Sequence, residues 1–331
     1  MTTETFATTR EQTLAALRAA DKLLLVTHEN PDGDALGSLV AMHGVLQQLG
    51  KDSLMFIAPD EYPLPYEYRF FDLDGAVTAP PEDVADRLVV FLDCGNIDRN
   101  PAVLDHGAPL RIVNVDHHHD NTRFGEIDHV VDAASCTAEI VWDLMRGLGV
   151  EATAEIADAL YVGLVTDTGK FMYENTGTRA HVMAAELIAA GVDVHSIYRR
   201  LYEGVPFAKI KLMARALDRV ERYDSEGLTL ARIRVSDYQE TGSEESYSEG
   251  IVDHLRAVAG TKVAALVKEL TDPAKAGRAK VSLRAADESI DVSAIARAGG
   301  GGGHRMAAGF TTSLTEPELV AFLRAEVAAQ L

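Results

Sequence analysis

The first two hundred residues of the chain alternate short apolar runs with longer segments whose apolar residues recur at helical spacing. The apolar runs predict buried strands at 22–27, 88–92 and 111–115. The periodic segments predict helices at about 35–49, 137–148, 155–165 and 179–190. This alternation is typical of an α/β fold with a doubly wound parallel sheet.

The pattern changes after residue 200. A long amphipathic helical stretch containing Gly204 and Pro206 predicts a connection between two domains. Beyond it, strands are predicted at 228–235 and 261–270, and residues 279–286 alternate strictly between apolar and polar positions.

The last hundred residues end in two further helices. The first is predicted at 292–297, and the second begins with the capping-box pair Thr315 and Glu318. We therefore expect a doubly wound domain at 1–200, a helical linker at 201–222 and a smaller α/β domain with a mixed sheet at 223–331.

Composition narrows the functional classes. The 331 residues are 47% hydrophobic and 25% charged, and neither an apolar run of about 18 residues nor a leader-like start is present, so export or membrane insertion is not expected. Two cysteines, Cys94 and Cys136, are too few for a disulfide framework and favour a cytoplasmic location. The net charge of −20 argues against a grip on long duplex nucleic acid, so any anionic substrate must be attracted by metals and a few local cations.

Four apolar segments end in acidic residues or histidines. The residues are His28, Asp32 and Asp34 after the first strand, Asp93 after the second, Asp116, His117 and His118 after the third, and Asp167 after the helix at 155–165. Ligands of such sheets bind beyond the carboxyl ends of strands, so these side chains can converge. Five aspartates in one cleft would raise one another's pKa values unless cations compensated them. The set points to hard divalent metals and chemistry on phosphate.

Each segment alone has a simpler interpretation. Asn30 to Gly33 could be a solvated turn in which an aspartate caps the helix, and a histidine tract could face solvent, as we expect for His119. Gly33 is also expected to need a special backbone conformation. The presence of all four segments in one chain favours the metal site.

A run of five glycines, 299–303, precedes His304. Such a run could be a flexible linker. It lies between an apolar helix and the apolar stretch at 306–310, where a flexible spacer has no purpose. Glycine N–H groups can approach a phosphate closely, with His304 and either Arg284 or Arg305 as further donors. We therefore favour a phosphate-binding loop.

The chain resembles the DHH phosphoesterases, whose name matches Asp116-His117-His118. The order of the four segments matches the four motifs of that family, and the glycine-rich segment ending in His304 matches its C-terminal DHH-associated domain. Length and second domain are most similar to the nano-RNase/pAp phosphatase group. That resemblance implies hydrolysis of short oligoribonucleotides such as linear diadenylate, of 3′-phosphoadenosine 5′-phosphate (pAp) and of cyclic-di-AMP, by a homodimer.

The resemblance also implies roles for individual residues. One metal would be held by His28, Asp32 and Asp93, and the other by Asp34, Asp93, His117 and Asp167, with Asp93 bridging. Two Mn²⁺ ions are implied, with Mg²⁺ or Co²⁺ as alternatives, and hydroxide shared by the metals would attack phosphorus. His118 would contact phosphate or donate a proton, while Asp116 would orient its neighbours. The residues that would hold the substrate are Ser282, Arg284, Gly301, Gly302, Gly303 and His304. Of these, Arg284 and His304 would also contribute to catalysis.

The active site is then expected in the cleft between the two domains. Gly299 departs from the family pattern, which often has a bulky apolar residue before four glycines. Two other functions remain as alternatives: an inorganic pyrophosphatase, which shares the first domain, and a non-catalytic nucleotide sensor. The intact set of metal ligands favours an enzyme over a sensor.

Overall fold

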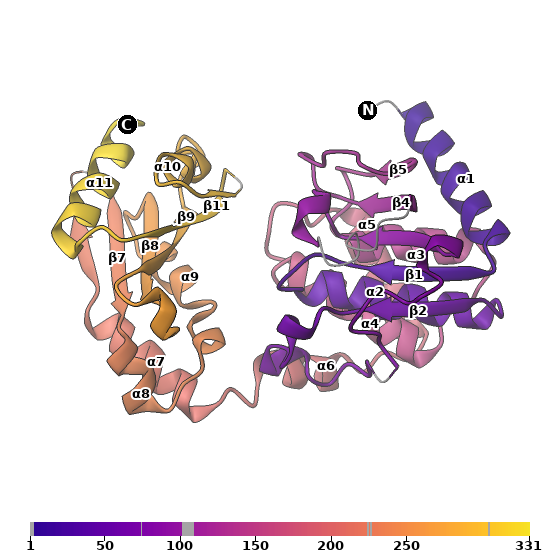
Figure 1. Ribbon diagram of the computed structural model, residues 1–331, viewed down its shortest axis with the longest axis horizontal. Helices are drawn as coiled ribbons and strands as arrows, with labels where there is room; N and C mark the ends of the chain where they lie inside the picture. The colour runs from indigo at the N-terminus through magenta and orange to yellow at the C-terminus, as the bar shows by residue number, and fades with distance from the viewer. Residues whose placement is uncertain (1–2, 74, 101–108, 224, 226, 304) are drawn as a thin grey trace. The chain divides into compact units, whose positions relative to one another are not determined.

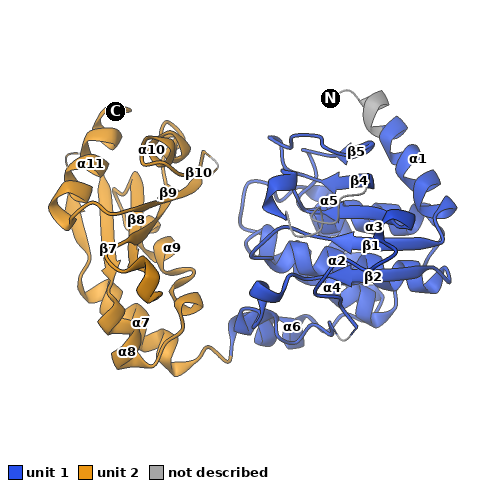
Figure 2. Ribbon diagram, viewed as in Figure 1, with its two compact units in different colours: residues 1–203 blue, residues 204–331 orange. Residues whose placement is uncertain are grey.

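The computed structural model describes residues 3–73, 75–100, 109–223, 225, 227–303 and 305–331 (Figure 1). The chain divides into two compact units, Met1–Glu203 and Gly204–Leu331 (Figure 2). Every hydrophobic cluster in the described residues lies within one unit. Each unit therefore has its own core.

Unit 1 is built on a five-stranded sheet in the order β2-β1-β3-β4-β5, in which every neighbouring pair is parallel. The strands are β1 (Lys22–Val26), β2 (Asp52–Phe56), β3 (Leu88–Leu92), β4 (Arg111–Asp116) and β5 (Ile127–Val130). The helices are α1 (Thr3–Ala19), α2 (Gly33–Gln48), α3 (Thr137–Gly147), α4 (Ala154–Asp167), α5 (Thr178–Ala189) and α6 (Val194–Tyr202). The predicted α/β fold with a parallel sheet is confirmed.

The central strands β1 and β3 are buried on both faces, which is why they are almost wholly apolar. On one face, Leu39 of α2, Leu144 of α3 and Leu160 of α4 pack with Val90 of β3. Phe91, the next residue of β3, points to the other face, into a smaller cluster made with connecting segments. The helices α2, α3 and α4 thus cover one face of the sheet, while connecting segments cover the other.

Unit 2 contains a mixed sheet of six strands in the order β10-β11-β9-β8-β7-β6. Only β7 and β8 are parallel among its described pairs. The strands are β6 (Glu221–Tyr223), β7 (Leu228–Ile233), β8 (Val263–Glu269), β9 (Ala279–Ala285), β10 (Gly302–Gly303) and β11 (Ala307–Thr312). The helices are α7 (Phe207–Asp218), α8 (Val235–Thr241), α9 (Ile251–Arg256), α10 (Val292–Ala298) and α11 (Glu316–Ala328).

The two faces of this sheet carry separate cores. Leu283 of β9, Ile295 of α10 and Leu323 of α11 belong to one cluster, and Leu212 of α7 and Leu255 of α9 belong to the other. The capping box is present at the start of α11, where Thr315 donates to the Glu318 carboxylate at 2.6 Å. The strict alternation at 279–286 thus marks a strand whose apolar residues Val281, Leu283 and Ala285 face the first of these cores, while its polar residues lie on the other face.

The structural division falls after Glu203, and α7 packs with α8 and β7 inside unit 2. The domain limits expected at 200 and 222 stay a prediction. Among the described helices, none is by itself long and apolar enough to span a membrane, although the bent pair α5 and α6 meets that test of length and composition when taken together.

Candidate metal centre

Three parallel strands and two helices bring predicted metal ligands to one edge of the sheet in unit 1. His28 follows β1, Asp93 follows β3 directly, and His117 follows β4. Asp34 lies in the first turn of α2, which starts at this edge, and Asp167 is the last residue of α4. Residues far apart in the chain therefore meet where the strands end.

The start of α2 is held by its own aspartate. One oxygen of Asp32, Oδ1, accepts hydrogen bonds from the N–H groups of Asp34 at 3.0 Å and Ala35 at 3.1 Å. Asp32 is therefore the helix cap of the simpler interpretation. Its second oxygen, Oδ2, makes neither of these bonds, so capping and metal binding are compatible.

The glycine between the two carboxylates has a different role from the one expected. Gly33 does not adopt a left-handed conformation; a Cβ atom there would lie 2.4 Å from Oγ1 of Thr166 in α4. The expectation of a special backbone conformation is wrong, and the physical reason for glycine is close approach of α2 to α4. That approach brings Asp34 of α2 near Asp167 of α4.

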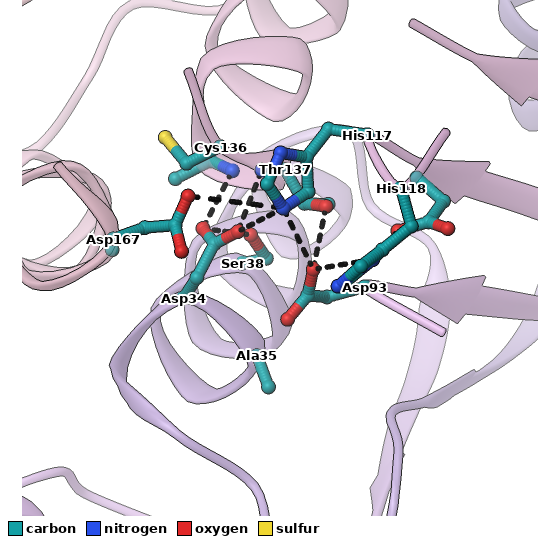
Figure 3. A network of polar contacts seen from close by, with 12 residues as sticks. Asp34, Ala35, Ser38, Asp93, His117, His118, Cys136, Thr137 and Asp167 are labelled. Carbon is teal, nitrogen blue, oxygen red and sulfur yellow. Dashed lines mark hydrogen bonds and ion pairs between the residues drawn. The ribbon is translucent and has the colours of Figure 1, made fainter. Parts of the chain in front are cut away.

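His117 is surrounded by carboxylates. Figure 3 shows its ring between Asp34, Asp93 and Asp167. Its Nε2 atom lies 4.0 Å from Oδ2 of Asp34, 3.7 Å from Oδ1 of Asp93 and 3.8 Å from Oδ2 of Asp167. These separations are too long for hydrogen bonds, whereas ligands about 2.1 Å from one shared ion lie roughly 3–4 Å apart.

Asp93 lies between two groups of side chains. Its backbone is left-handed, with φ of 59°, which is uncommon for a residue other than glycine and turns the chain sharply after β3. Oδ2 lies 3.5 Å from Nε2 of His28, while Oδ1 faces His117 and lies 3.8 Å from Nδ1 of His118. Each oxygen of this buried carboxylate thus faces a different set of ligands.

The start of α3 supports two of the aspartates, a feature that the sequence analysis missed. The N–H groups of Thr137 and Ala138 donate to Asp34 at 2.6 Å and 2.9 Å, and the Thr137 hydroxyl donates to Oδ1 of Asp93 at 3.0 Å. N–H groups at a helix start favour negative charge. The available signal was a small-residue segment, Ala134 to Thr137, before an apolar helix.

Crowding and burial shift the pKa values of these carboxyl groups. Burial raises the pKa of Asp34 well above its ordinary value, and Asp93 and Asp167 raise it further. Burial also raises the pKa of Asp167 to about 7, although His117 opposes the rise. For Asp93, burial acts to raise the pKa, but contact with His28 and the nearby histidines outweighs it, and the pKa is lowered.

The aspartate of the Asp-His-His segment holds one of the two histidines. Oδ1 of the fully buried Asp116 lies 2.8 Å from Nδ1 of His118, and its Oδ2 accepts a 2.6 Å hydrogen bond from Asn121. Burial acts to lower the pKa of His118, but the bond to Asp116 and the charge of Asp93 raise it to about 9. Asn121 was missed because nothing in its local pattern marks it. His119 is exposed, as expected.

The donor set fits hard divalent metals. Three groups each place one ligand atom per residue within 4.8 Å of the others: His28, Asp32 and Asp93; Asp34, His117 and Asp167; and Asp93, His117 and His118. Carboxylate oxygens with imidazole nitrogens suit Mn²⁺ and related ions, whose charge would offset the crowded carboxylates. The structure thus brings together all six expected ligands; which of them coordinate stays a prediction.

In unit 2, β9 carries two of the expected substrate residues on one face, with Ser282 and Arg284 two positions apart. Ser282 pairs with Gly309 of β11, which in turn pairs with Gly302 of β10, so Ser282 and Gly302 share one row across the sheet. The Arg284 guanidinium lies 3.8 Å from Asp253 and donates to the Leu283 carbonyl. His304 lies outside the described residues.

The three glycines of the expected substrate loop are not equivalent. A Cβ atom at Gly301 would lie 2.2 Å from the Gly309 carbonyl oxygen, and one at Gly303, whose φ is +136°, would lie 2.6 Å from Cα of Ala308. Both are thus needed for β10 to lie against β11. At Gly302 an added Cβ would meet nothing within 4 Å. All three glycines are exposed, and Gly302 is the one at which a side chain would meet open space.

Comparisons with known proteins agree with this geometry. Residues 22–164 match the DHH family N-terminal domain, and residues 232–330 match the DHHA1 domain. The chain is 33% identical over 291 residues to the bifunctional oligoribonuclease and PAP phosphatase NrnA of Thermus thermophilus, covering 87% of this chain and 83% of that protein. It is 27% identical over 305 residues to the cyclic-di-AMP phosphodiesterase GdpP of Geobacillus thermodenitrificans, covering 86% of this chain and 44% of GdpP.

A solved structure shares the fold along nearly the whole chain. An exopolyphosphatase-related protein from Bacteroides fragilis superposes with a TM-score of 0.86 at 22% identity, covering 98% of this chain and 96% of that one. Fold, site and matched domains together define a phosphoesterase, a hydrolase that acts on nucleotides. The chain belongs to the DHH family and carries its DHHA1 domain, and its relatives include several NrnA proteins.

Proposed function

We propose that this protein is an Mn²⁺-dependent phosphoesterase that hydrolyses short oligoribonucleotides, linear diadenylate and pAp, and that also accepts cyclic-di-AMP. The observation that carries the proposal is the convergence of His28, Asp32 and Asp93 in one group and Asp34, His117 and Asp167 in another. The names of NrnA and GdpP, which describe oligoribonucleotide, PAP and cyclic-di-AMP hydrolysis, support this range of substrates.

Bound divalent metals would supply an activated water and offset charge on the phosphate. The chain's own residues supply the rest. In the metal-free protein, burial acts to lower the pKa of His118, but the bond to Asp116 and the charge of Asp93 outweigh burial and raise the pKa to about 9, so the site favours the protonated ring. Because Asp116 binds its Nδ1, the proton that His118 offers to the phosphate or the leaving oxygen is the one on Nε2. Asn121 orients Asp116 and so fixes the ring.

Unit 2 would hold the nucleotide. The Arg284 guanidinium and the Ser282 hydroxyl are donors of the kind that bind phosphate, and the exposed Gly302 lies in the same row of the sheet as Ser282. With His304, these residues would bind the end of the substrate and limit its length to two or a few nucleotides. The net charge of −20 disfavours binding of long duplex nucleic acid.

The remaining parts of the proposal concern location and assembly. We place the enzyme in the cytoplasm, which suits two cysteines that are both buried and unpaired. The family resemblance supports a homodimer. Light scattering after size-exclusion chromatography at micromolar concentration distinguishes a mass of two chains from the 35.7 kDa of one.

The direct test is release of AMP from diadenylate by the purified protein, with and without Mn²⁺. The Asp93→Ala variant should lose activity by several orders of magnitude, because Asp93 belongs to two of the ligand groups. Asp132→Ala, an exposed aspartate after β5, serves as the matched control and should act like the wild type. Equal rates for Asp93→Ala and the wild type would refute the assigned site.

The substrate range needs a side-by-side panel with identified products. It should contain diadenylate, pAp, cyclic-di-AMP and inorganic pyrophosphate at equal concentrations. The proposal expects kcat/KM for diadenylate and pAp to exceed that for pyrophosphate. A preference for pyrophosphate would make the protein a pyrophosphatase, and tight AMP binding without turnover at saturating Mn²⁺ would make it a sensor.

A further inference from the structure

Arg99 lies beside the metal centre but belongs to none of the ligand groups. It ends the short 3₁₀ helix Ile97–Arg99, which follows β3. Its carbonyl oxygen accepts from the Glu29 N–H at 2.8 Å, and the next residue, Asn100, donates from its side chain to the Thr27 carbonyl at 2.5 Å. These contacts tie the segment after β3 to the segment that carries His28.

The Arg99 guanidinium reaches the His28 ring. Its Nη2 atom lies 3.0 Å from Nδ1 of His28, and the same ring nitrogen lies 2.7 Å from the Glu29 carbonyl oxygen. One nitrogen cannot serve both neighbours, because the carbonyl requires a proton on Nδ1 and the guanidinium requires a lone pair there. Whether Nδ1 of His28 carries a proton therefore decides which of the two contacts is a hydrogen bond.

Metal binding by His28 would favour the hydrogen bond to Glu29 over the contact with Arg99. The opposite nitrogen, Nε2, lies 3.5 Å from Oδ2 of Asp93, on the side of the ligand group that contains Asp32. If Nε2 gives its lone pair to a metal, the proton is on Nδ1 and is donated to the Glu29 carbonyl. Arg99 then has no acceptor on His28.

Arginine carries five N–H donors and no acceptor, so it requires an anionic or carbonyl partner. Among the described residues, no carboxylate lies within ion-pair distance of Arg99, although it lines a cavity of about 100 Å³ together with Glu29, Asp60 and Glu61. The side chain is half-buried rather than spread into solvent. Arg99 is thus a cation next to the metal centre with donors to spare.

We propose that Arg99 is a substrate-binding residue that donates to a phosphate oxygen of the nucleotide from unit 1. A planar guanidinium matches phosphate geometry and gives stronger hydrogen bonds than a neutral donor. In a chain with a net charge of −20, such a local cation also helps an anionic substrate approach. This inference rests on the proposed function, since it assumes a nucleotide phosphate at the metal centre.

The test compares wild type, Arg99→Gln, Arg99→Lys and the control Arg111→Gln. Arg111 begins β4, at the end of the strand opposite to His117, and is exposed. Three quantities are measured on each full-length protein: Mn²⁺ affinity by calorimetry, AMP affinity at saturating Mn²⁺, and KM and kcat for diadenylate. Calorimetric AMP binding does not require turnover.

For Arg99→Gln we expect KM for diadenylate and the Kd for AMP to rise roughly 10- to 100-fold, which is the loss of a hydrogen bond to a charged group. Mn²⁺ affinity should change by less than about threefold, because the metal-holding His28 keeps its bond to Glu29. Arg99→Lys should recover part of the loss, and Arg111→Gln should match the wild type.

The outcomes separate this inference from the proposed function. An unchanged KM and AMP affinity in Arg99→Gln would overturn the inference, and so would a loss of Mn²⁺ affinity that accounts for the whole effect, because Arg99 would then only position His28. If the wild type binds AMP in an Arg99-dependent way but cleaves no substrate of the panel, the proposed function fails and the phosphate contact stands.

Discussion

Thr137 is a single residue that hydrogen-bonds to two of the expected metal ligands. Its N–H donates to Asp34 at 2.6 Å and its hydroxyl donates to Asp93 at 3.0 Å, so one residue fixes the orientation of two expected ligands. Removal of a group that orients a metal ligand commonly weakens metal binding by roughly 10- to 100-fold.

We therefore expect Thr137→Val to weaken Mn²⁺ binding by about tenfold, because it removes the hydroxyl donor and keeps the shape of the side chain. Thr137→Ser restores the hydroxyl and should bind Mn²⁺ like the wild type. Calorimetry or the electron paramagnetic resonance signal of free Mn²⁺ measures the affinity. The same affinity in Thr137→Val and Thr137→Ser would contradict this role.

The raised pKa values predict how the stability of the metal-free protein depends on pH. The Asp167 carboxyl has a folded-state pKa of about 7, above its ordinary value of 3.8, so the folded protein holds this proton more tightly than the unfolded chain does. The stability contributed by the proton is present below about pH 4 and is lost as pH rises towards 7. Asp34, whose pKa is also raised, acts in the same direction.

In chelator-treated protein, we expect the melting temperature to fall between pH 5 and pH 8, and the fall to be smaller in Asp167→Asn, which cannot titrate. The raised pKa of His118 contributes a further loss up to about pH 9, and this part remains in the variant. Because Mn²⁺ competes with these protons, its stabilising effect should grow over the same range. Identical pH profiles of the melting temperature for the two proteins would argue against a raised pKa of Asp167.

The candidate residues could be found because residue type and position carried the information locally, and the family resemblance selected six of them as ligands. His28, Asp93 and His117 each follow an apolar strand, where a charged or polar side chain must have a partner. Arg99 and Asn121 have ordinary local sequences, and only their contacts distinguish them.

Three helices build the site by their ends rather than by their faces. The first turn of α2 carries Asp34, α4 ends at Asp167, and the start of α3 donates N–H groups to Asp34. Periodicity predicted all three helices, because each buries an apolar face on the sheet. It could not predict their contacts with one another, such as the approach of Gly33 to Thr166, because those depend on how the helices pack.

In unit 2, the departure at Gly299 has a packing explanation. A Cβ atom there would lie 2.6 Å from the ring of Phe310 in β11, so that ring occupies the space a larger side chain would need. We expect Gly299→Leu to destabilise unit 2 by about 1–3 kcal/mol through overpacking. In a Phe310→Ala background the same change should cost less, because the ring is gone.

A double-mutant cycle of thermal unfolding tests this pair. The expected coupling between positions 299 and 310 is at least about 1 kcal/mol in the favourable direction. Additive effects of the two substitutions would show that Phe310 does not limit the side chain at Gly299.

At the scale of the whole molecule, the two units have separate cores, which predicts separable functions. The fragment Met1–Glu203 should fold and bind Mn²⁺ with an affinity within about threefold of that of the full chain, since all six expected ligands lie in it. Its kcat/KM for diadenylate should fall by about 100-fold or more, because the fragment lacks at least two donors that would hydrogen-bond to phosphate.

The control is the full chain with Arg284→Gln, which removes one of these donors and should lose roughly tenfold in kcat/KM. Full activity of the fragment would place all substrate contacts in unit 1. Failure of the fragment to fold, seen by circular dichroism, would show that the cores depend on each other.

The sequence by itself determined the α/β class, the strands β1, β3 and β4, the helices α2 to α5, and the acidic and histidine segments from which the family resemblance selects six candidate metal ligands; β2, β5 and α1 were not predicted. It could do so because hydrophobic periodicity and the chemistry of each side chain are local properties. Tertiary structure decided what surrounds those residues: Thr137 supports Asp93 and Asp34 across 44 and 103 positions of the chain, and Arg99 lies beside His28 across 71. Such contacts exist only once the strands have aligned their ends, so no local pattern records them.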